Sequence, residues 1–388
     1  MRPGRMDKNN RRRILSFALL ALAAPNARTR AAEAGPPRVL AEFALEPRAD
    51  LILLPVRVDG KERNFLLDTG STVSVFDRSL SSGAPVALVP VDPPSGPSVE
   101  KRLFAAPEAS VGGLDMRPAG PVLYNNLAAM RAVSDRDVWG LIGMRFLKSY
   151  IVQVDFDAGK VRLLDPRTIP RDDWGSAVPM RLNGAGIPEV KAEIAGQGPE
   201  IFKIDTGDNG GGNLERSLFE RLFPGKRGAR SKSLMFTGMK SSPSGRVPSL
   251  SLGGFSFRGL VFESGTGSSL GLAFVRRSVV TFDFPRGSLY LRAGSRLEVQ
   301  EDADMSGLHL LRLEGRIVAL AIDPGSPAAQ AGMLVGDVVL GAAGQTEAPS
   351  DLVALRRLLR SGDGKSVTLD VQRGGRRVPI ELRLRKLL

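Results

Sequence analysis

Two Asp-Thr-Gly triplets constrain the fold of this 388-residue chain more than any other feature of its sequence. Each triplet ends an apolar, strand-like run: "ERNFLLDTG" ends at Gly70 and "PEIFKIDTG" ends at Gly207. A second strand pattern precedes each run, with turn signals at Asp59-Gly60 and from Gly196 to Gly198. A single triplet would be interpreted as a turn after a strand. Two copies in the same context indicate an internal repeat.

A second correspondence lies further along both copies. Residues 140–164 align without gaps to residues 268–292, which places Gly143 on Gly271 and Asp155 on Asp283. The order of the matches predicts two homologous β-rich lobes, residues 39–166 and 177–293, joined by a Pro-containing linker. Because a duplicated unit can pack with approximate two-fold symmetry, we expect Asp68 to lie beside Asp205.

Composition narrows the chemistry that this chain can perform. The sequence has 44 glycines and 27 prolines but few aromatic residues, which predicts many short strands joined by turns. It has no cysteine and one histidine, His309, so Cys-ligated zinc, a thiolate nucleophile and a multi-histidine metal site are excluded. We therefore expect no metal and no cofactor. Carboxylates, lysines or hydroxyls must supply any catalysis that does not use His309.

Two adjacent carboxylates have a definite chemistry. Because two negative charges close together repel, the pair holds one proton over a range of pH. The ionised member can activate a water molecule while the protonated member polarises a carbonyl group. Glycine after Asp-Thr suits a tight turn, and the threonine hydroxyl can brace the neighbouring lobe. The residue types of the repeated turn thus favour acid-base hydrolysis.

These motifs resemble those of the retropepsin-like aspartic peptidases in their bacterial, two-lobed form. The resemblance rests on "LLDTGS" and "KIDTGD", each followed by an apolar-Gly element, "GLIGMRFL" and "SLGLAFV", and covers most of residues 39–293. It implies that Asp68 and Asp205 form the catalytic pair and that β-hairpin flaps lie near residues 91–103 and 236–247. It also implies that the active-site turns are supported by Thr69, Gly70, Ser71, Thr206, Gly207, Asp208, Gly143 and Gly271.

Positions 71 and 208 differ in what they imply for the site. Ser71 fits the family, where a hydroxyl at this position hydrogen-bonds the catalytic carboxylate. Asp208 departs from the family pattern, because it adds a third carboxylate next to the pair. Such a carboxylate either raises the pKa of one pair member or is directed away as a turn cap.

The C-terminal part has a different pattern, in which strands alternate with two helical segments. "GSPAAQAGMLVGDVVL" resembles a PDZ domain, and the likeness runs from about residue 303 to 388. It implies that the loop "SGLHL" binds a peptide carboxylate and that the peptide adds a strand there. The residues implied in peptide binding are Gly307, Leu308, His309 and Leu310. A packing or dimerisation module with an empty groove is the alternative, and His309 is interpreted as a structural residue.

The first residues have the pattern of an export signal. In "RRRILSFALLALAAP" a cationic stretch precedes an apolar run that is short for a membrane span. Residues 1–34 are therefore interpreted as an export signal and the start of a linker, with an uncleaved anchor as the alternative. Either places the folded part outside the cytoplasm, in the periplasm or cell envelope of a bacterium. The formal net charge of +13 is interpreted as solvated basic faces, because no basic stripe is interleaved with aromatic residues.

Taken together, the sequence predicts a mostly β protein: a two-lobed pepsin/retropepsin-like acid protease fold followed by an α+β PDZ domain. The expected function is that of an exported aspartic endopeptidase, active as a monomer, with a PDZ module for substrate or partner tails. We expect peptide or protein substrates, no nucleic acid, and membrane contact only through an uncleaved signal. One alternative is an inactive peptide-binding or quality-control protein. Another is a structural envelope protein whose basic tail binds an anionic polymer.

Overall fold

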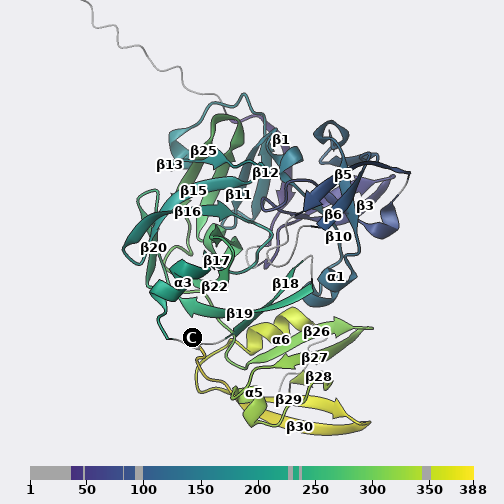
Figure 1. The fold of residues 1–388 in the computed structure, drawn as a ribbon, viewed down its shortest axis with the longest axis vertical. Coiled ribbons are helices and arrows are strands. Elements are labelled where there is room, and N and C mark those ends of the chain that lie inside the picture. The colour runs from purple at the N-terminus through teal and green to yellow at the C-terminus, as the bar shows by residue number, and fades with distance from the viewer. Residues whose placement is uncertain are drawn as a thin grey trace, which may run out of the picture. The chain divides into compact units, whose positions relative to one another are not determined.

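The chain forms mostly β-structure, as its turn-rich composition predicts (Figure 1). The computed structural model describes residues 36–388, except residues 47–48, 82, 92–98, 226–229, 236–237 and 343–350. The predicted export signal lies outside the described residues. Within them, no helix is long and apolar enough to cross a membrane. The α-helices are short: α1 (Ala128–Ser134), α2 (Met144–Leu147), α3 (Arg216–Leu222), α4 (Leu272–Val275), α5 (Pro327–Gln330) and α6 (Leu352–Leu358).

The first repeat forms one sheet, with the strand order β5-β6-β9-β4-β10-β3-β2-β7-β8. The two strands that precede the first Asp-Thr-Gly, β2 and β3, form a hairpin whose turn, Asp59-Gly60, has two positive φ angles. Strand β10 lies parallel to β3 and antiparallel to β4. The strands are β2 (Leu53–Val58), β3 (Lys61–Leu67), β4 (Val75–Asp77), β5 (Pro85–Val91), β6 (Val99–Phe104), β7 (Ala109–Val111), β8 (Leu114–Asp115), β9 (Val122–Asn125) and β10 (Val138–Ile142).

The second repeat forms a sheet of the same design, with the order β18-β19-β22-β17-β23-β16-β15-β20-β21 and β14 paired to β15. Each strand of this path has its counterpart at the same place in the first sheet, including the parallel pair β16 and β23. The strands are β14 (Arg181–Leu182), β15 (Pro188–Ile194), β16 (Gln197–Ile204), β17 (Gly212–Glu215), β18 (Arg230–Met235), β19 (Gly238–Arg246), β20 (Ser249–Leu252), β21 (Phe255–Arg258), β22 (Val261–Gly265) and β23 (Ser269–Leu270).

One turn differs from the sequence prediction. The β15–β16 hairpin turns at Ala195 and Gly196, both with positive φ, and not over Gly196 to Gly198. Gln197 already pairs with Ile194, and the ladder register shifts between Ala192 and Ile194. The two-residue turn is favoured because its twist matches that of the paired strands. The additional glycine therefore belongs to an irregular strand.

A third sheet joins the two repeats, with the order β1-β12-β11-β24-β25-β13. At its centre β11 and β24 pair antiparallel, so that Gln153 lies opposite Thr281, its counterpart in the gapless alignment. The Gln153 Nε2 amide donates a hydrogen bond of 3.0 Å to the Thr281 hydroxyl. The pseudo-two-fold axis therefore passes through this pair. The strands are β1 (Val39–Ala44), β11 (Ile151–Asp155), β12 (Lys160–Leu164), β13 (Ser176–Pro179), β24 (Ser278–Asp283) and β25 (Ser288–Ala293).

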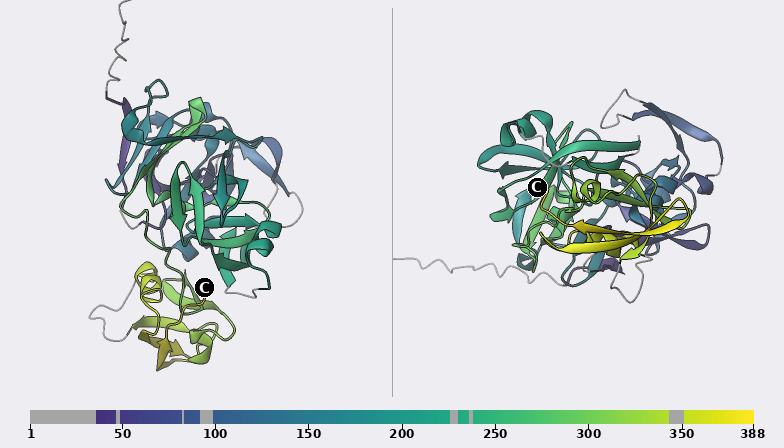
Figure 2. Two further views of the ribbon diagram at one scale, coloured as in Figure 1. Left: turned by 90° about the vertical axis from the view of Figure 1, so that its left-hand side faces the viewer. Right: turned by 90° about the horizontal axis from the view of Figure 1, so that it is seen from below.

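The C-terminal module has a separate sheet and a separate core (Figure 2). Its strands follow the order β26-β27-β28-β29-β30, which leaves β26 at one edge. Helix α6 packs its apolar side on this sheet through Leu352 and Leu355. A different core cluster runs through both repeats and the joining sheet. The strands are β26 (Leu308–Leu313), β27 (Arg316–Ile322), β28 (Val338–Ala342), β29 (Ser366–Arg373) and β30 (Arg376–Arg383).

Each repeat contributes a long hairpin at the position expected for a flap. The first consists of β5 and β6, and the second of β18 and β19. The turn residues 92–98 and 236–237, on which the two flap predictions partly fall, lie outside the described residues.

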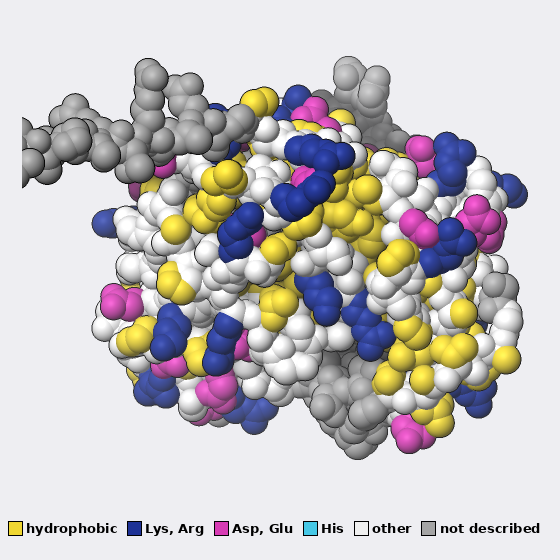
Figure 3. All heavy atoms as spheres, turned by 90° about the horizontal axis from the view of Figure 1, so that it is seen from above, with side chains coloured by type: hydrophobic (Ala, Val, Ile, Leu, Met, Phe, Trp, Pro, Cys, Tyr) yellow, Lys and Arg dark blue, Asp and Glu magenta, His cyan; other side chains and the backbone are white. Residues whose placement is uncertain are grey.

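The basic residues are dispersed on the face shown in Figure 3. There, Lys and Arg side chains of the described residues alternate with acidic and apolar ones. This distribution agrees with solvated basic faces on that side of the molecule.

Candidate functional site

The two Asp-Thr-Gly turns lie at the ends of equivalent strands. Asp68 follows β3, and its amide donates a 3.1 Å hydrogen bond to the Ile142 carbonyl at the end of β10. Asp205 follows β16, and its amide donates a 2.9 Å hydrogen bond to the Leu270 carbonyl at the end of β23. Because each aspartate extends a parallel strand pair inside a sheet, its backbone position is held by two strands.

The two turns are held together by their threonines. Both side chains are fully buried. The Thr69 amide donates to the Thr206 hydroxyl at 3.0 Å, and the Thr206 amide donates to the Thr69 hydroxyl at 3.0 Å. Each hydroxyl then donates to a carbonyl of the other repeat, at 2.7 Å. The turns therefore cannot separate without leaving several buried polar groups unpaired.

The carboxyl groups of Asp68 and Asp205 lie within hydrogen-bonding reach of each other. Glycine makes this approach possible, because a Cβ on Gly70 would lie 2.4 Å from Asp205 Cγ and one on Gly207 would lie 2.7 Å from Asp68 Cγ. Each glycine amide also donates a 2.9 Å hydrogen bond to the aspartate two residues before it. The structure thus brings together the two aspartates that the repeat predicts as neighbours.

Gly143 and Gly271 lie against the two turns, as the sequence resemblance implies. A Cβ on Gly143 would be 2.4 Å from the Val73 carbonyl oxygen, and one on Gly271 would be 2.3 Å from the Gly210 carbonyl oxygen. The amides that follow these glycines donate hydrogen bonds to the turn carbonyls of Ser71 and Asp208. Any larger residue at either glycine would push the turn out of place.

The side chains of Ser71 and Asp208 cap their own turns. The Ser71 hydroxyl donates to the Val73 carbonyl at 2.8 Å and not to the Asp68 carboxylate, which differs from the expectation. Asp208 Oδ1 accepts a 2.9 Å hydrogen bond from the Gly210 amide. A short polar side chain in a tight turn satisfies the nearest backbone group, which explains both contacts.

Electrostatics in this site favour proton retention. Burial raises the pKa of Asp68, and burial together with the charge of Asp68 raises the pKa of Asp205. Burial and the charge of Asp205 also raise the pKa of Asp208, to about 7. Three carboxyl groups with raised pKa values therefore lie close together, and the pair can hold a proton near neutral pH.

Sequence analysis missed Arg276, which links the two repeats near the second turn. Its Nη2 donates to the Asn209 carbonyl at 3.0 Å, and its Nη1 donates to the Ala49 carbonyl of the first repeat at 3.3 Å. The gapless alignment of the two repeats could have pointed to Arg276, because this residue aligns with another basic residue, Lys148.

The predicted peptide-binding loop of the C-terminal module is hydrogen-bonded to its own chain. The Gly307 amide donates to Asp304 Oδ2 at 2.5 Å, and the Leu308 amide donates to the Ser306 hydroxyl at 3.1 Å. His309 Nε2 lies 2.9 Å from Asp323 Oδ1. Leu310 lies in β26, with its side chain in the module core. Two of the amides expected to bind a peptide carboxylate, those of Gly307 and Leu308, are thus already used.

Comparison with known proteins identifies one part of the chain. No curated protein matches it. Residues 318–373 match the family model of the PDZ domain. These residues include most of β27, all of β28 and β29, and helices α5 and α6, in agreement with the resemblance seen in the motif "GSPAAQAGMLVGDVVL". The chain is therefore a mostly β protein that carries a PDZ domain.

Proposed function

We propose that this protein is an aspartic endopeptidase. A water molecule activated between the carboxyl groups of Asp68 and Asp205 would hydrolyse the peptide bonds of its substrates. The observation that carries the proposal is the close approach of these carboxyl groups, which belong to equivalent turns of two repeats. The threonine contacts beneath them hold the two turns together, which keeps the carboxyl groups close enough to share a proton. Hairpins β5–β6 and β18–β19 would serve as the flaps over an extended peptide.

In the proposed reaction the pair holds one proton. The ionised carboxylate accepts a proton from a water molecule, whose oxygen attacks the scissile carbonyl. The protonated carboxyl donates a hydrogen bond to the carbonyl oxygen. As the C–N bond of the intermediate breaks, this carboxyl gives its proton to the leaving amine nitrogen, and the pair again holds one proton, the one taken from water. Raised pKa values suit this role, because one proton then stays on the pair at moderate pH. No covalent intermediate with the protein forms.

Variants Asp68→Asn and Asp205→Asn test this proposal. Each replaces a carboxyl group by an amide of the same size, so that the fold is kept while proton transfer is lost. We expect cleavage of denatured casein, followed by release of labelled peptides, to fall by at least about 100-fold in each variant. Asp59→Asn is the matched control, since Asp59 lies in an exposed turn. Wild-type rates in both active-site variants would refute the proposal.

Asp208 favours a second candidate, a peptide-binding protein without catalysis. Its charge opposes ionisation of Asp68, so the doubly protonated pair, which has no carboxylate to accept a proton from water, persists to a higher pH. Peptide binding without hydrolysis by the wild-type protein, together with hydrolysis by Asp208→Ser, would identify this candidate. Hydrolysis by the wild-type protein would exclude it.

We also propose that the protein is exported to the periplasm or cell envelope and that its PDZ domain positions substrates or a partner. The cationic and apolar pattern of residues 11–24 supports export. Fractionation of cells that express the full chain tests it, with recovery in the cytoplasm as the contrary result.

A further inference from the structure

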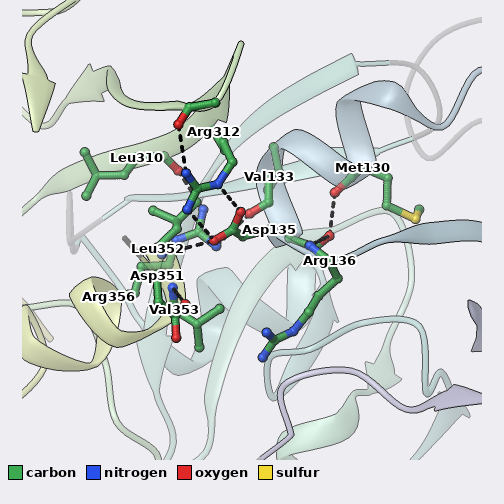
Figure 4. Close-up of polar contacts among 12 residues, drawn as sticks. Met130, Val133, Asp135, Arg136, Leu310, Arg312, Asp351, Leu352, Val353 and Arg356 are labelled. Carbon is green, nitrogen blue, oxygen red and sulfur yellow. Dashed lines mark hydrogen bonds and ion pairs between the residues drawn. The ribbon is translucent and has the colours of Figure 1, made fainter. Parts of the chain in front are cut away.

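The end of helix α1, in the first repeat, contacts the PDZ domain at strand β26 (Figure 4). Asp135 ends this helix with a left-handed backbone, φ 56°. Its carboxylate forms a bidentate ion pair with Arg312 of β26 through Nε and Nη2. It also accepts a 3.1 Å hydrogen bond from the Leu352 amide at the start of α6. One carboxylate thus bridges the strand and the helix of the PDZ domain.

A second arginine completes this contact. Arg356 of α6 donates through Nη1 to the Val133 carbonyl at 2.7 Å and through Nη2 to the Leu310 carbonyl at 2.6 Å. Leu310 belongs to β26, the edge strand of the sheet. An incoming peptide that adds a strand to β26 would need backbone groups on this edge. The end of α1 and the Arg356 side chain therefore lie where such a peptide would bind.

The Asp135–Arg312 ion pair is stronger than an exposed surface pair because both side chains are largely buried. The side chains of Arg312 and Asp135 are only 27% and 13% exposed. A bidentate arginine-carboxylate pair in such surroundings is stronger and more directional than an exposed one. The surface of β26 and α6 is therefore built to receive a carboxylate from a neighbouring segment.

The loop before β26 indicates which kind of carboxylate the β26–α6 surface selects. Asp304 accepts hydrogen bonds from the amides of Ser306 and Gly307. The Leu308 amide is used as well, by the Ser306 hydroxyl, so two of the four loop amides predicted to bind a terminal carboxylate are already hydrogen-bonded inside the chain. This reduced donor set favours recognition of side-chain carboxylates at Arg312 and Arg356 over recognition of a terminal carboxylate.

We propose that the β26–α6 surface of the PDZ domain binds acidic peptide segments and that Asp135 occupies it as an internal competitor. An acidic segment from a partner or substrate displaces the end of α1 and takes its place at Arg312 and Arg356. The inference concerns binding alone and does not depend on peptide hydrolysis.

Fluorescence anisotropy with the full chain tests this directly. The probe is a fluorescein-labelled decapeptide with three glutamates and a C-terminal valine, compared with the same peptide carrying three lysines. Asp135→Gly removes the competitor, and glycine suits the left-handed backbone there. We expect this variant to bind the glutamate peptide at least about tenfold more tightly than wild type. Asp59→Gly, the same change at an exposed residue with φ 47°, should bind as wild type.

Three further measurements make the test decisive. Asp135→Asn, which keeps the side-chain size, should also bind more tightly than wild type, so the result does not depend on one variant folding well. Arg312→Gln in the Asp135→Gly background should lose most of the gain. Amidation of the peptide C-terminus should weaken binding less than replacement of glutamate by lysine.

The proposal is overturned by any of three results. One is equal affinity, or no binding, of the glutamate peptide for wild type and both Asp135 variants. Another is equal binding of the glutamate and lysine peptides to Asp135→Gly. The third is a larger loss on amidation than on charge reversal, which would show recognition of the terminal carboxylate instead.

Discussion

Thr69 and Thr206 exchange hydrogen bonds in both directions, amide to hydroxyl, across the boundary between the two repeats. Each hydroxyl also donates to the carbonyl two residues before the other threonine. The contact is reciprocal because the two turns have the same sequence and face one another across a pseudo-two-fold axis. It fixes the distance between Asp68 and Asp205.

Removal of one hydroxyl of this pair should destabilise the whole protein. Thr69→Ala or Thr206→Ala leaves a buried amide of the other repeat and a buried carbonyl unpaired, at a cost of about 2–4 kcal/mol. Urea unfolding measures the change. Thr69→Ser, which retains the hydroxyl, should recover most of the loss. Thr168→Ala is the control, because the Thr168 hydroxyl is buried but has no hydrogen-bond partner among the described residues. Equal losses for Thr69→Ala and Thr168→Ala would contradict the prediction.

Gly70 and Gly207 should not tolerate a side chain. Their φ angles are not in the left-handed region, so the restriction is contact with the carboxyl group of the opposite aspartate. Gly70→Ala should cost about 1–3 kcal/mol through overpacking and should reduce the proposed hydrolysis by about 100-fold through displacement of the pair. Thermal unfolding and casein cleavage measure the two effects. Gly184→Ala is the control, since nothing lies within 4 Å of its Cβ position. Unchanged stability and cleavage in Gly70→Ala would show that the turns are further apart.

Asp208 should make the protein less stable as the pH rises. Its pKa is raised to about 7 in the folded state, against 3.8 as its ordinary value, so the folded protein retains a proton that the unfolded chain has lost. The penalty is absent below pH 4 and grows as the pH rises to about 7. Asp208→Asn should therefore raise the melting temperature by about 3 °C at pH 8 and have little effect at pH 3.5. Melting curves of both proteins across this range provide the measurement, and a lower melting temperature at pH 8 would contradict it.

Asp77, in contrast to Asp208, should make the protein more stable as the pH rises from about 2 to about 4. Burial alone would raise its pKa, but hydrogen bonds from Ser79, Arg131 and Leu127 outweigh burial and hold the pKa at about 2. The ionised carboxylate therefore stabilises the folded state above about pH 4, and this stabilisation is lost as the pH falls towards 2. Asp77→Asn should cost about 2 kcal/mol at pH 7 and much less at pH 2.5. Chemical unfolding at the two pH values tests this, and a pH-independent cost would argue for a steric effect.

Local patterns in the sequence predicted much of this architecture. The gapless alignment of residues 140–164 with 268–292 anticipated the equivalent strands β11 and β24 that pair at the centre of the joining sheet. The helical pattern in "LVALRRLL" became α6. Such features follow from residue order alone, because turn residues and apolar spacing act over a few neighbours. The sequence prediction put the β15–β16 turn at the wrong residues. Several successive residues could form this turn, and strand pairing decided between them.

Local sequence patterns could not predict contacts between segments that are far apart in the sequence. Arg276 contacts Ala49, and Asp135 contacts Arg312, across separations for which no local rule exists. From the sequence alone, the Ser71 hydroxyl could have faced Asp68 or its own turn. The tertiary structure places it on the Val73 carbonyl of its own turn.

By itself, the sequence determined that this chain repeats a strand-turn unit ending in Asp-Thr-Gly and ends in a PDZ domain, because these depend on residue identities at fixed spacing. The repeat predicted that Asp68 lies beside Asp205, but only the tertiary structure showed that Gly70 and Gly207 each lie against the opposite carboxyl group. It alone also decided that Asp135 lies on the PDZ edge strand. Both encounters join residues more than a hundred positions apart, and their closeness is set by the packing of whole sheets.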